Sequence, residues 1–242
     1  MIIEGKNSVL EALESNTSIN KVILQNGTQD GIAQKIINLA KSRKINIIFL
    51  DKQSFLNLSP SKRPQGVIAD IVDFDYSSVQ DILSYATSKG EEPIIVILDG
   101  IEDPHNLGSV VRVCECAGVH GVIIPKNRAV EVNETVVRIS AGALHYVKVA
   151  RVTNINDTIK ELKEKGVWVY SAEADGQNIY NTNLKGAIAL IIGGENTGVK
   201  RLTKELSDAV ISIPMYGKIN SLNASVACGI VLYEAVRQRK GK

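Results

Sequence analysis

The stretch IIVILDGIEDPHNLGSVVRVCECAG, residues 94–118, decides the fold that we predict. Its first six residues form a continuous apolar run that ends at Asp99, which is typical of a strand buried on both faces of a parallel sheet. A loop follows, and a helix is predicted over about 106–117 because Leu107, Val110, Val111 and Cys114 fall on one stripe. A buried strand that passes through a polar loop into a helix indicates an α/β domain with its ligand site at that loop.

The same alternation continues toward the end of the sequence. We predict helices over 131–143, 156–165, 199–206 and 221–239, and strands over 121–125, 146–152, 167–172, 187–193 and 209–214. Strands that alternate with helices imply a mostly parallel sheet covered on both faces.

Toward the N-terminus the sequence predicts a second, smaller α/β unit. Its helices are expected over 5–14, 30–42 and 52–58, and its strands over 21–25, 45–50 and 66–72. Residues 74–92 are polar and acidic, and we interpret them as a linker that contains one short helix. The predicted domains are therefore 1–73 and 93–242, joined by the linker 74–92.

Composition bounds the function classes. The 242 residues carry a formal net charge of +2, with 44% apolar and 22% charged residues, as in ordinary soluble globular proteins. No signal peptide or membrane span is predicted, and the three cysteines, which form no C-x-x-C pair, favour a reducing compartment, the cytoplasm. Three scattered histidines predict no metal site. Basic residues gather between Lys35 and Arg63 and again over 237–242, which suits phosphate contacts, although a plain solvated surface remains open.

Three segments carry polar groups where a strand ends. In the first, Asn106 stands at an expected helix N-cap and Arg112 on the polar flank of that helix; a cap and a surface charge are the structural alternatives. In the second, Glu195 follows a glycine pair that a simple turn could also explain. The third opens the last helix with Asn220, Ser221, Asn223 and Ser225, of which Ser221 could be only the cap. Neither a G-x-G-x-x-G nor a P-loop pattern is present, so a nucleotide-dependent dehydrogenase lacks its fingerprint.

Together these segments resemble the three signature motifs of the SpoU/TrmH family of the SPOUT superfamily, the RNA 2′-O-ribose methyltransferases. The matching stretches are DPHNLGSVVRVCECAG (103–118), IIGGENTG (191–198) and ISIPMYGKINSLNASVA (211–227), in the family's order and spacing over residues 93–242. GKNSVLEAL (5–13) is similar to the start of the family's RNA-binding domain, a ribosomal-protein-like α/β fold.

The resemblance implies a fold and a cofactor. It implies an α/β catalytic domain whose parallel sheet ends in a deep trefoil knot, in which S-adenosylmethionine is held largely by backbone groups. The positions that match the cofactor site are Gly193, Gly194, Ile213 and Leu222. It also implies a homodimer, with each site near the interface, and a reaction that needs no metal.

The resemblance also implies catalytic positions. Arg112 matches the family's catalytic arginine, and the other polar active-site positions match Asn106, Glu195, Ser221 and Asn223. Because a guanidinium stays protonated in proteins, we expect Arg112 to stabilise the developing alkoxide rather than to accept its proton. One departure is Cys114 and Cys116 in the first helix, which we expect to change core packing only.

The substrate implied by the resemblance is RNA. Length and the closing segment favour a guanosine ribose in 23S rRNA, and the separate N-terminal domain favours rRNA over tRNA. A tRNA 2′-O-methyltransferase and a non-catalytic RNA-binding protein of ribosome assembly remain as alternatives.

Overall fold

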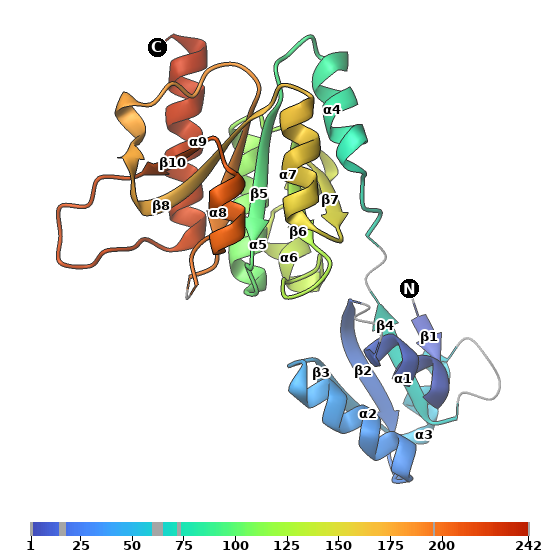
Figure 1. Cartoon of the computed structure of the whole chain (residues 1–242). Helices are drawn as coiled ribbons and strands as arrows, with labels where there is room; N and C mark the ends of the chain where they lie inside the picture. The colour runs from blue at the N-terminus through green and yellow to red at the C-terminus, as the bar shows by residue number, and fades with distance from the viewer. Residues whose placement is uncertain (1, 15–17, 60–64, 72–73, 196, 242) are drawn as a thin grey trace. The chain divides into compact units, whose positions relative to one another are not determined.

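The computed structural model describes residues 2–14, 18–59, 65–71, 74–195 and 197–241 (Figure 1). The chain divides into two compact units. The first comprises Met1–Phe74 with Val132–Glu134, and the second comprises Asp75–Glu131 with Thr135–Lys242. Each unit has its own hydrophobic core. Within the described ranges, no helix is both long enough and apolar enough to cross a membrane.

The first unit is a four-stranded mixed sheet with helices on both faces. Its strand order is β1-β4-β2-β3, built from β1 (Ile2–Glu4), β2 (Ile19–Gln25), β3 (Asn46–Leu50) and β4 (Val67–Ile71). Strands β2 and β3 are parallel, whereas β4 runs antiparallel to β1 and β2. Strand β1 was not among the predicted strands, because three residues are too few to show an alternating pattern.

Alternate residues of β2 point into two different cores, as the twofold period of a strand requires. Val22 and Leu24 pack with α1 (Lys6–Glu14) and α2 (Gly31–Ser42). Ile23 packs on the other face, against Phe55 of α3 (Lys52–Leu58). This three-layer arrangement gives a small unit two buried faces.

The second unit is a six-stranded sheet in which every pair is parallel, in the order β10-β8-β9-β5-β6-β7. The strands are β5 (Ile94–Asp99), β6 (Gly121–Pro125), β7 (Lys148–Val152), β8 (Trp168–Asn178), β9 (Ile188–Gly193) and β10 (Ala209–Ser212). Strand β5 lies near the centre and is buried along its whole length, as its apolar run predicts. The predicted α/β class and parallel sheet are confirmed, and the trefoil knot stays a prediction.

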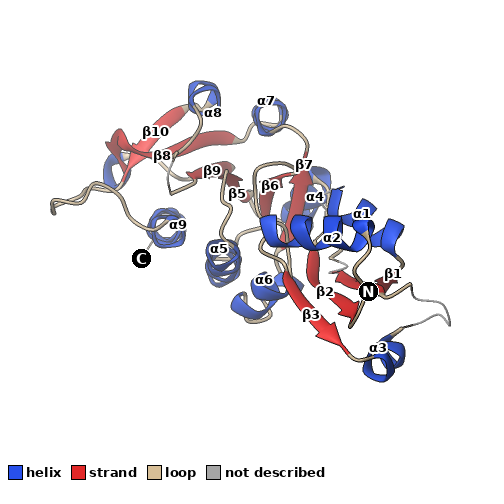
Figure 2. Cartoon of the chain, turned by 90° about the horizontal axis from the view of Figure 1, so that it is seen from below, coloured by secondary structure: helices blue, strands red, loops and turns tan. Residues whose placement is uncertain are grey.

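Helices cover both faces of this sheet. Figure 2 shows α7 (Ile155–Glu164) and α8 (Arg201–Leu206) on one face and α5 (Pro104–Cys116), α6 (Glu134–Ile139) and α9 (Ala224–Lys240) on the other. The chain makes two short 3₁₀ turns, Ala143–His145 and Ile179–Asn181. The helix predicted over 131–143 is shorter because Ala141 and Gly142 take positive φ angles of 50° and 89°.

From Asp75 onward, the stretch 74–92 forms part of the second unit. It contains α4 (Val79–Ser88), whose Val79 and Ile82 belong to the same core cluster as the buried residues of α7. A Cβ added to Gly121 would lie 2.4 Å from Ile82, which shows how closely α4 approaches β6. The acidic residues that we interpret as a mark of a linker therefore lie within and beside a helix that is packed on the sheet.

Strand β8 bulges beside β10. Val210 pairs with Ser171, but the next residue, Ile211, pairs with Gln177. Residues 172–176 of β8 therefore have no partner in β10, and a Cβ on Gly176 would lie only 2.5 Å from the Ile211 carbonyl carbon. A bulge of this kind re-aims side chains beside a ligand site.

Candidate active site

The site begins where β5 and β9 end side by side, at Asp99 and Gly193. The Asp99 side chain is only 1% exposed, and its two oxygens accept hydrogen bonds from the backbone N–H of Lys200 at 3.0 Å and from the Lys200 Nζ at 2.6 Å. The Gly194 N–H donates to the Asp99 carbonyl at 3.0 Å. Asp99 thus fixes both ends of the loop that follows β9, the far end through its carboxylate and the near end through its backbone carbonyl.

The glycine pair is required by contacts within the protein itself. A Cβ on Gly193 would lie 2.1 Å from the Gly198 carbonyl carbon, and one on Gly194 would lie 2.4 Å from the Gly100 oxygen. The Gly198 N–H donates to the Gly194 carbonyl at 2.8 Å and closes the turn. A glycine pair at this place predicts a close approach of ligand to backbone, whereas the structure shows a close approach of backbone to backbone.

Asn106, Glu195 and Asn223 come from three separate segments and meet in one hydrogen-bonded cluster. The Asn106 Nδ2 donates to the Glu195 Oε1 at 3.0 Å. The Asn223 Nδ2 donates to the Asn106 Oδ1 at 2.9 Å and to the same Glu195 oxygen at 2.6 Å. Residues 117 positions apart are thereby held in contact, and each of the three signature motifs contributes one member.

The expected N-cap role of Asn106 is wrong. Helix α5 begins at Pro104, with Asp103 as its N-cap accepting the His105 N–H at 2.9 Å. Proline suits the first helical position because the N–H that it lacks would have no partner there. Asn106 lies inside the first turn and is only 5% exposed, so its side chain is free of capping and can join Glu195.

The expected start of the last helix at Ser221 is also wrong. Helix α9 begins at Ala224, and Asn223 is its N-cap, with its Oδ1 accepting the N–H of Ser225 at 2.9 Å. Both polar atoms of the Asn223 amide therefore make hydrogen bonds. The oxygen caps the helix, and the nitrogen donates to Asn106 and Glu195. Ser221 stays in the loop before the helix.

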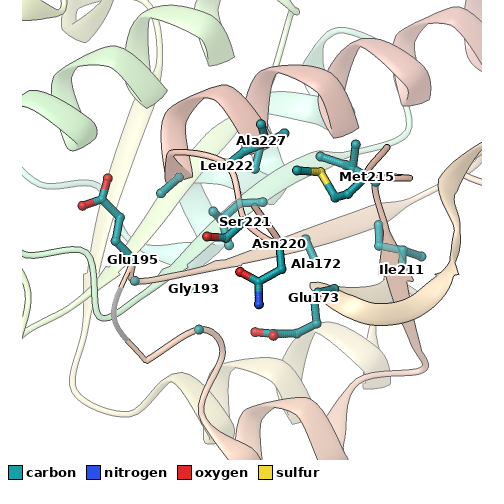
Figure 3. A pocket seen from close by; sticks show the side chains of 16 residues that line it. Ala172, Glu173, Gly193, Glu195, Ile211, Met215, Asn220, Ser221, Leu222 and Ala227 are labelled. Carbon is teal, nitrogen blue, oxygen red and sulfur yellow. The ribbon is translucent and has the colours of Figure 1, made fainter. Parts of the chain in front are cut away.

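A cavity of about 160 Å³ opens beside the cluster (Figure 3). Predicted site residues line it from the second and third motifs: Gly193, Gly194, Glu195, Ile213, Ser221 and Leu222. Much of the remaining wall is apolar, from Ile192, Ile211, Met215, Ala224 and Ala227. Two further polar side chains, Glu173 and Asn220, also line the cavity. Asn220 is among the polar residues that the sequence predicts at this site, whereas Glu173 is not.

A second cavity of about 210 Å³ lies against the same cluster. Asn106, Gly194 and Glu195 line it together with Gly100–Asp103 and Thr197. Glu195 and Gly194 line both cavities, so the cluster stands where the two spaces meet. Such an arrangement can hold two reactants, one on each side of a shared polar wall.

Arg112 is the predicted residue that stands apart. It is exposed on α5, and among the described residues it lines neither cavity.

Further along α5, Cys114 is fully buried, and burial with the neighbouring Cys228 raises the pKa of its thiol well above the usual value. Within the described part of the chain, no group of three or more histidine, cysteine or acidic side chains is placed to hold a metal ion.

Fold and site together define a class: a parallel α/β domain whose polar cluster and cavity lie at the carboxyl ends of the strands. The SpoU rRNA Methylase family matches residues 93–233, and the RNA 2′-O ribose methyltransferase substrate binding family matches residues 2–77. The chain therefore belongs to the SpoU/TrmH family and is an RNA methyltransferase.

Relatives and solved structures agree with this assignment. YacO of Bacillus subtilis, which carries the name of a TrmH family tRNA/rRNA methyltransferase, is 42% identical, with 97% of this chain and 94% of that protein covered. The SpoU methyltransferase AviRb from Streptomyces viridochromogenes, crystallised with the cofactor AdoMet, is 23% identical, with a TM-score of 0.64 over 100% of this chain and 91% of that one. The A. aeolicus TrmH/SpoU tRNA modifying enzyme is 31% identical, with a TM-score of 0.57 over 62% of this chain and 77% of that one.

Proposed function

We propose that the protein transfers a methyl group from S-adenosylmethionine to the ribose 2′-hydroxyl of a guanosine in 23S rRNA, the specificity of RlmB. One observation carries the proposal: Asn106, Glu195 and Asn223 form a single hydrogen-bonded cluster, and Glu195 of this cluster lines both cavities. One cavity then receives the methyl donor and the other the target nucleotide.

The first cavity fits the methyl donor. Adenine needs an apolar wall, and Ile211, Ile213 and Met215 supply one. The sulfonium is cationic and suits a space bordered by the carboxylates of Glu173 and Glu195, with no lysine or arginine among the described lining residues. AviRb, a family member of the same fold, holds AdoMet, which supports the same cofactor here.

S-adenosylmethionine supplies a methyl group activated by the positive charge of its sulfur. The ribose oxygen must approach in line with the carbon–sulfur bond. The new oxygen–carbon bond then forms as the carbon–sulfur bond breaks, the thioether S-adenosylhomocysteine leaves, and the hydroxyl proton passes to solvent, so positioning supplies much of the acceleration. Glu195 is fixed by two amide donors on Oε1, which orients its other oxygen, Oε2. Asn106, Ser221 and Asn223 orient the ribose beside it.

The role of Arg112 is electrostatic. A guanidinium stays protonated in proteins, so Arg112 does not accept the hydroxyl proton. Its task is to bind the phosphate next to the target ribose and to stabilise the negative charge that develops on the 2′-oxygen. Its exposed position on α5 leaves it accessible to a large RNA substrate.

The working form is a homodimer in the cytoplasm. Large apolar side chains are exposed on the loop before α9 and on α9 itself: Met215, Ile219, Leu222, Val226 and Tyr233. Large apolar side chains exposed together on one loop and the helix that follows it favour an interface. Analytical ultracentrifugation tests the dimer, and sedimentation as a single 26.2 kDa chain at micromolar concentration would overturn it.

The decisive experiment maps ribose methylation in total RNA from a strain that lacks the gene. We expect one 2′-O-methylguanosine to disappear from 23S rRNA and to return when the gene is restored. Loss of a tRNA mark with rRNA untouched would move the substrate to tRNA, the substrate class named for the A. aeolicus relative. No loss in either RNA, with no S-adenosylmethionine binding by calorimetry, would favour the non-catalytic RNA-binding role.

A further inference from the structure

Glu173 is the carboxylate of the cofactor cavity that none of the signature motifs contains. It lies on the β8 bulge, residues 172–176, which has no partner in β10. Its Oε1 accepts the backbone N–H of Val199, and a Cβ on Gly198 would lie 2.6 Å from the same oxygen. The loop after β9 is therefore pressed directly against this carboxylate.

The carboxylate has acceptor capacity left over. Among the described residues, Val199 is the one hydrogen-bond donor found for Glu173, and it uses one of two oxygens. The side chain is half-buried, so a ligand that fills the cavity would remove the water that now solvates the second oxygen, Oε2. A charge desolvated in this way is costly unless the ligand itself donates a hydrogen bond.

The position of Glu173 selects which donor this is. In S-adenosylmethionine the ribose separates the sulfonium from the adenine. In Figure 3, Glu173 lies between Glu195, at the reacting end, and the apolar side chains of Ile211 and Met215, which suit the adenine. The vicinal 2′- and 3′-hydroxyls of the ribose are two donors on the part of the ligand that occupies this middle region.

We propose that Glu173 is a cofactor-binding residue whose Oε2 accepts hydrogen bonds from the ribose hydroxyls of S-adenosylmethionine while its Oε1 holds the Val199 N–H. This inference rests on the proposed function. Glu173 thus joins two tasks: it fixes the glycine loop from one side and orients the cofactor ribose from the other.

A double-mutant cycle between protein and ligand tests the contact. Isothermal titration calorimetry on the full chain measures binding of S-adenosylhomocysteine and of its 2′,3′-dideoxy counterpart. For the wild type we expect removal of the hydroxyls to weaken binding by about 10-fold to 100-fold, since hydrogen bonds to charged groups are strong. For Glu173→Ala the same removal should cost less than about threefold, because the acceptor is gone.

Two further variants separate ribose binding from loop support. Glu173→Gln keeps a neutral oxygen for the Val199 N–H, so it carries the test if the alanine variant does not fold; we expect a hydroxyl effect between those of the wild type and Glu173→Ala. Asp175→Asn is the matched control, because this β8 carboxylate binds Lys204 and is not part of the cavity lining. The control should retain the full wild-type effect of removing the hydroxyls.

The outcomes are distinguishable. An equal hydroxyl effect in the wild type and both Glu173 variants would overturn the inference and leave the proposed function intact, since the carboxylate would then serve the loop or another part of the ligand. If the wild type does not bind S-adenosylhomocysteine at all, the proposed function and the inference both fail.

Discussion

Within the described part of the chain, Arg112 differs from the other candidate residues because it lines neither cavity and makes no hydrogen bond to the Asn106–Glu195–Asn223 cluster. We therefore expect Arg112→Ala to reduce methyl transfer by about 100-fold or more while the cofactor dissociation constant changes by less than about threefold. Single-turnover transfer to rRNA and calorimetry with S-adenosylhomocysteine measure the two quantities. An equal loss of both would show that Arg112 supports the fold instead.

At the residue scale, the sequence predicts which residues belong to the site better than it predicts what each of them does. Asn106, Glu195 and Asn223 were selected as polar residues beside strand ends, and the structure brings all three together. The predicted N-caps are wrong because Asp103 and Asn223 also suit an N-cap, and the sequence does not show which of several suitable residues begins the helix. Glu173 was missed because its place depends on a register jump between β8 and β10, which leaves no local pattern.

Helix packing gives the next prediction, from two glycines within helices. A Cβ on Gly108 of α5 would lie 2.7 Å from the Ile139 Cβ of α6, which is too close for the backbones to stay in place. We expect Gly108→Ala to lower the free energy of unfolding by about 1–3 kcal/mol, although alanine favours a helix more than glycine does. Urea unfolding followed by the fluorescence of Trp168, the one tryptophan of the chain, measures this in the second unit.

Gly229 of α9 is the matched control for Gly108. Its added Cβ would meet Val113 at 3.6 Å, an ordinary contact. Gly229→Ala should therefore raise the free energy of unfolding by about 0.5–1 kcal/mol. If both substitutions shifted stability in the same direction, the closeness of α5 and α6 would not be the cause.

The start of β5 carries a pH-sensitive contact. His120 is 1% exposed; its Nδ1 accepts the Ile94 N–H at 3.0 Å, and its Nε2 lies 3.0 Å from Glu91. Burial lowers the pKa of His120, the Glu91 carboxylate opposes this, and the positive charges of Lys89 and Arg239 add to the lowering. The neutral ring therefore belongs to the folded state.

Acidification should weaken this contact. The unfolded histidine, with a pKa of about 6.5, takes up a proton before the folded one does, so stability is full above that pH and falls below it. We expect the wild type to lose more unfolding free energy between pH 7.5 and 5.5 than His120→Gln, whose amide does not titrate. Urea unfolding at each pH measures this. If the free energy of unfolding fell by the same amount in both proteins, His120 would be ruled out as the pH-sensitive group.

At the scale of the whole molecule, we expect the two units to divide the work between RNA and cofactor. All the lining residues of the cavity that we propose for the cofactor lie in the second unit, and the substrate-binding family matches residues 2–77. Removal of residues 1–73 should weaken rRNA binding by about tenfold or more through lost phosphate contacts, with cofactor affinity unchanged. Filter binding and calorimetry on the same preparation check this, and an unchanged RNA affinity would refute the division.

The fold was predictable at this scale because β5 and β9 are short apolar runs between helices, which specify a parallel sheet without further information. The extent of the second unit was harder to predict. Helix α4 lies in an acidic stretch of the sequence, and only packing of its Val79 and Ile82 against the sheet reveals that it belongs to the core. The charged residues of a segment describe its solvent-exposed face and do not show whether the opposite face is packed on a core.

The β8 bulge has a consequence for protein engineering and for divergence among relatives. Because residues 172–176 have no partner in β10, a change in their number would alter the cavity wall while the paired residues on either side keep their partners. A change of length there would leave the strand pairs on either side in register, and its cost would fall on the contacts of the bulge itself, where Gly176 packs against Ile211. A variant lengthened there by one or two residues is the natural starting point for a methyltransferase that accepts a cofactor with a bulkier ribose.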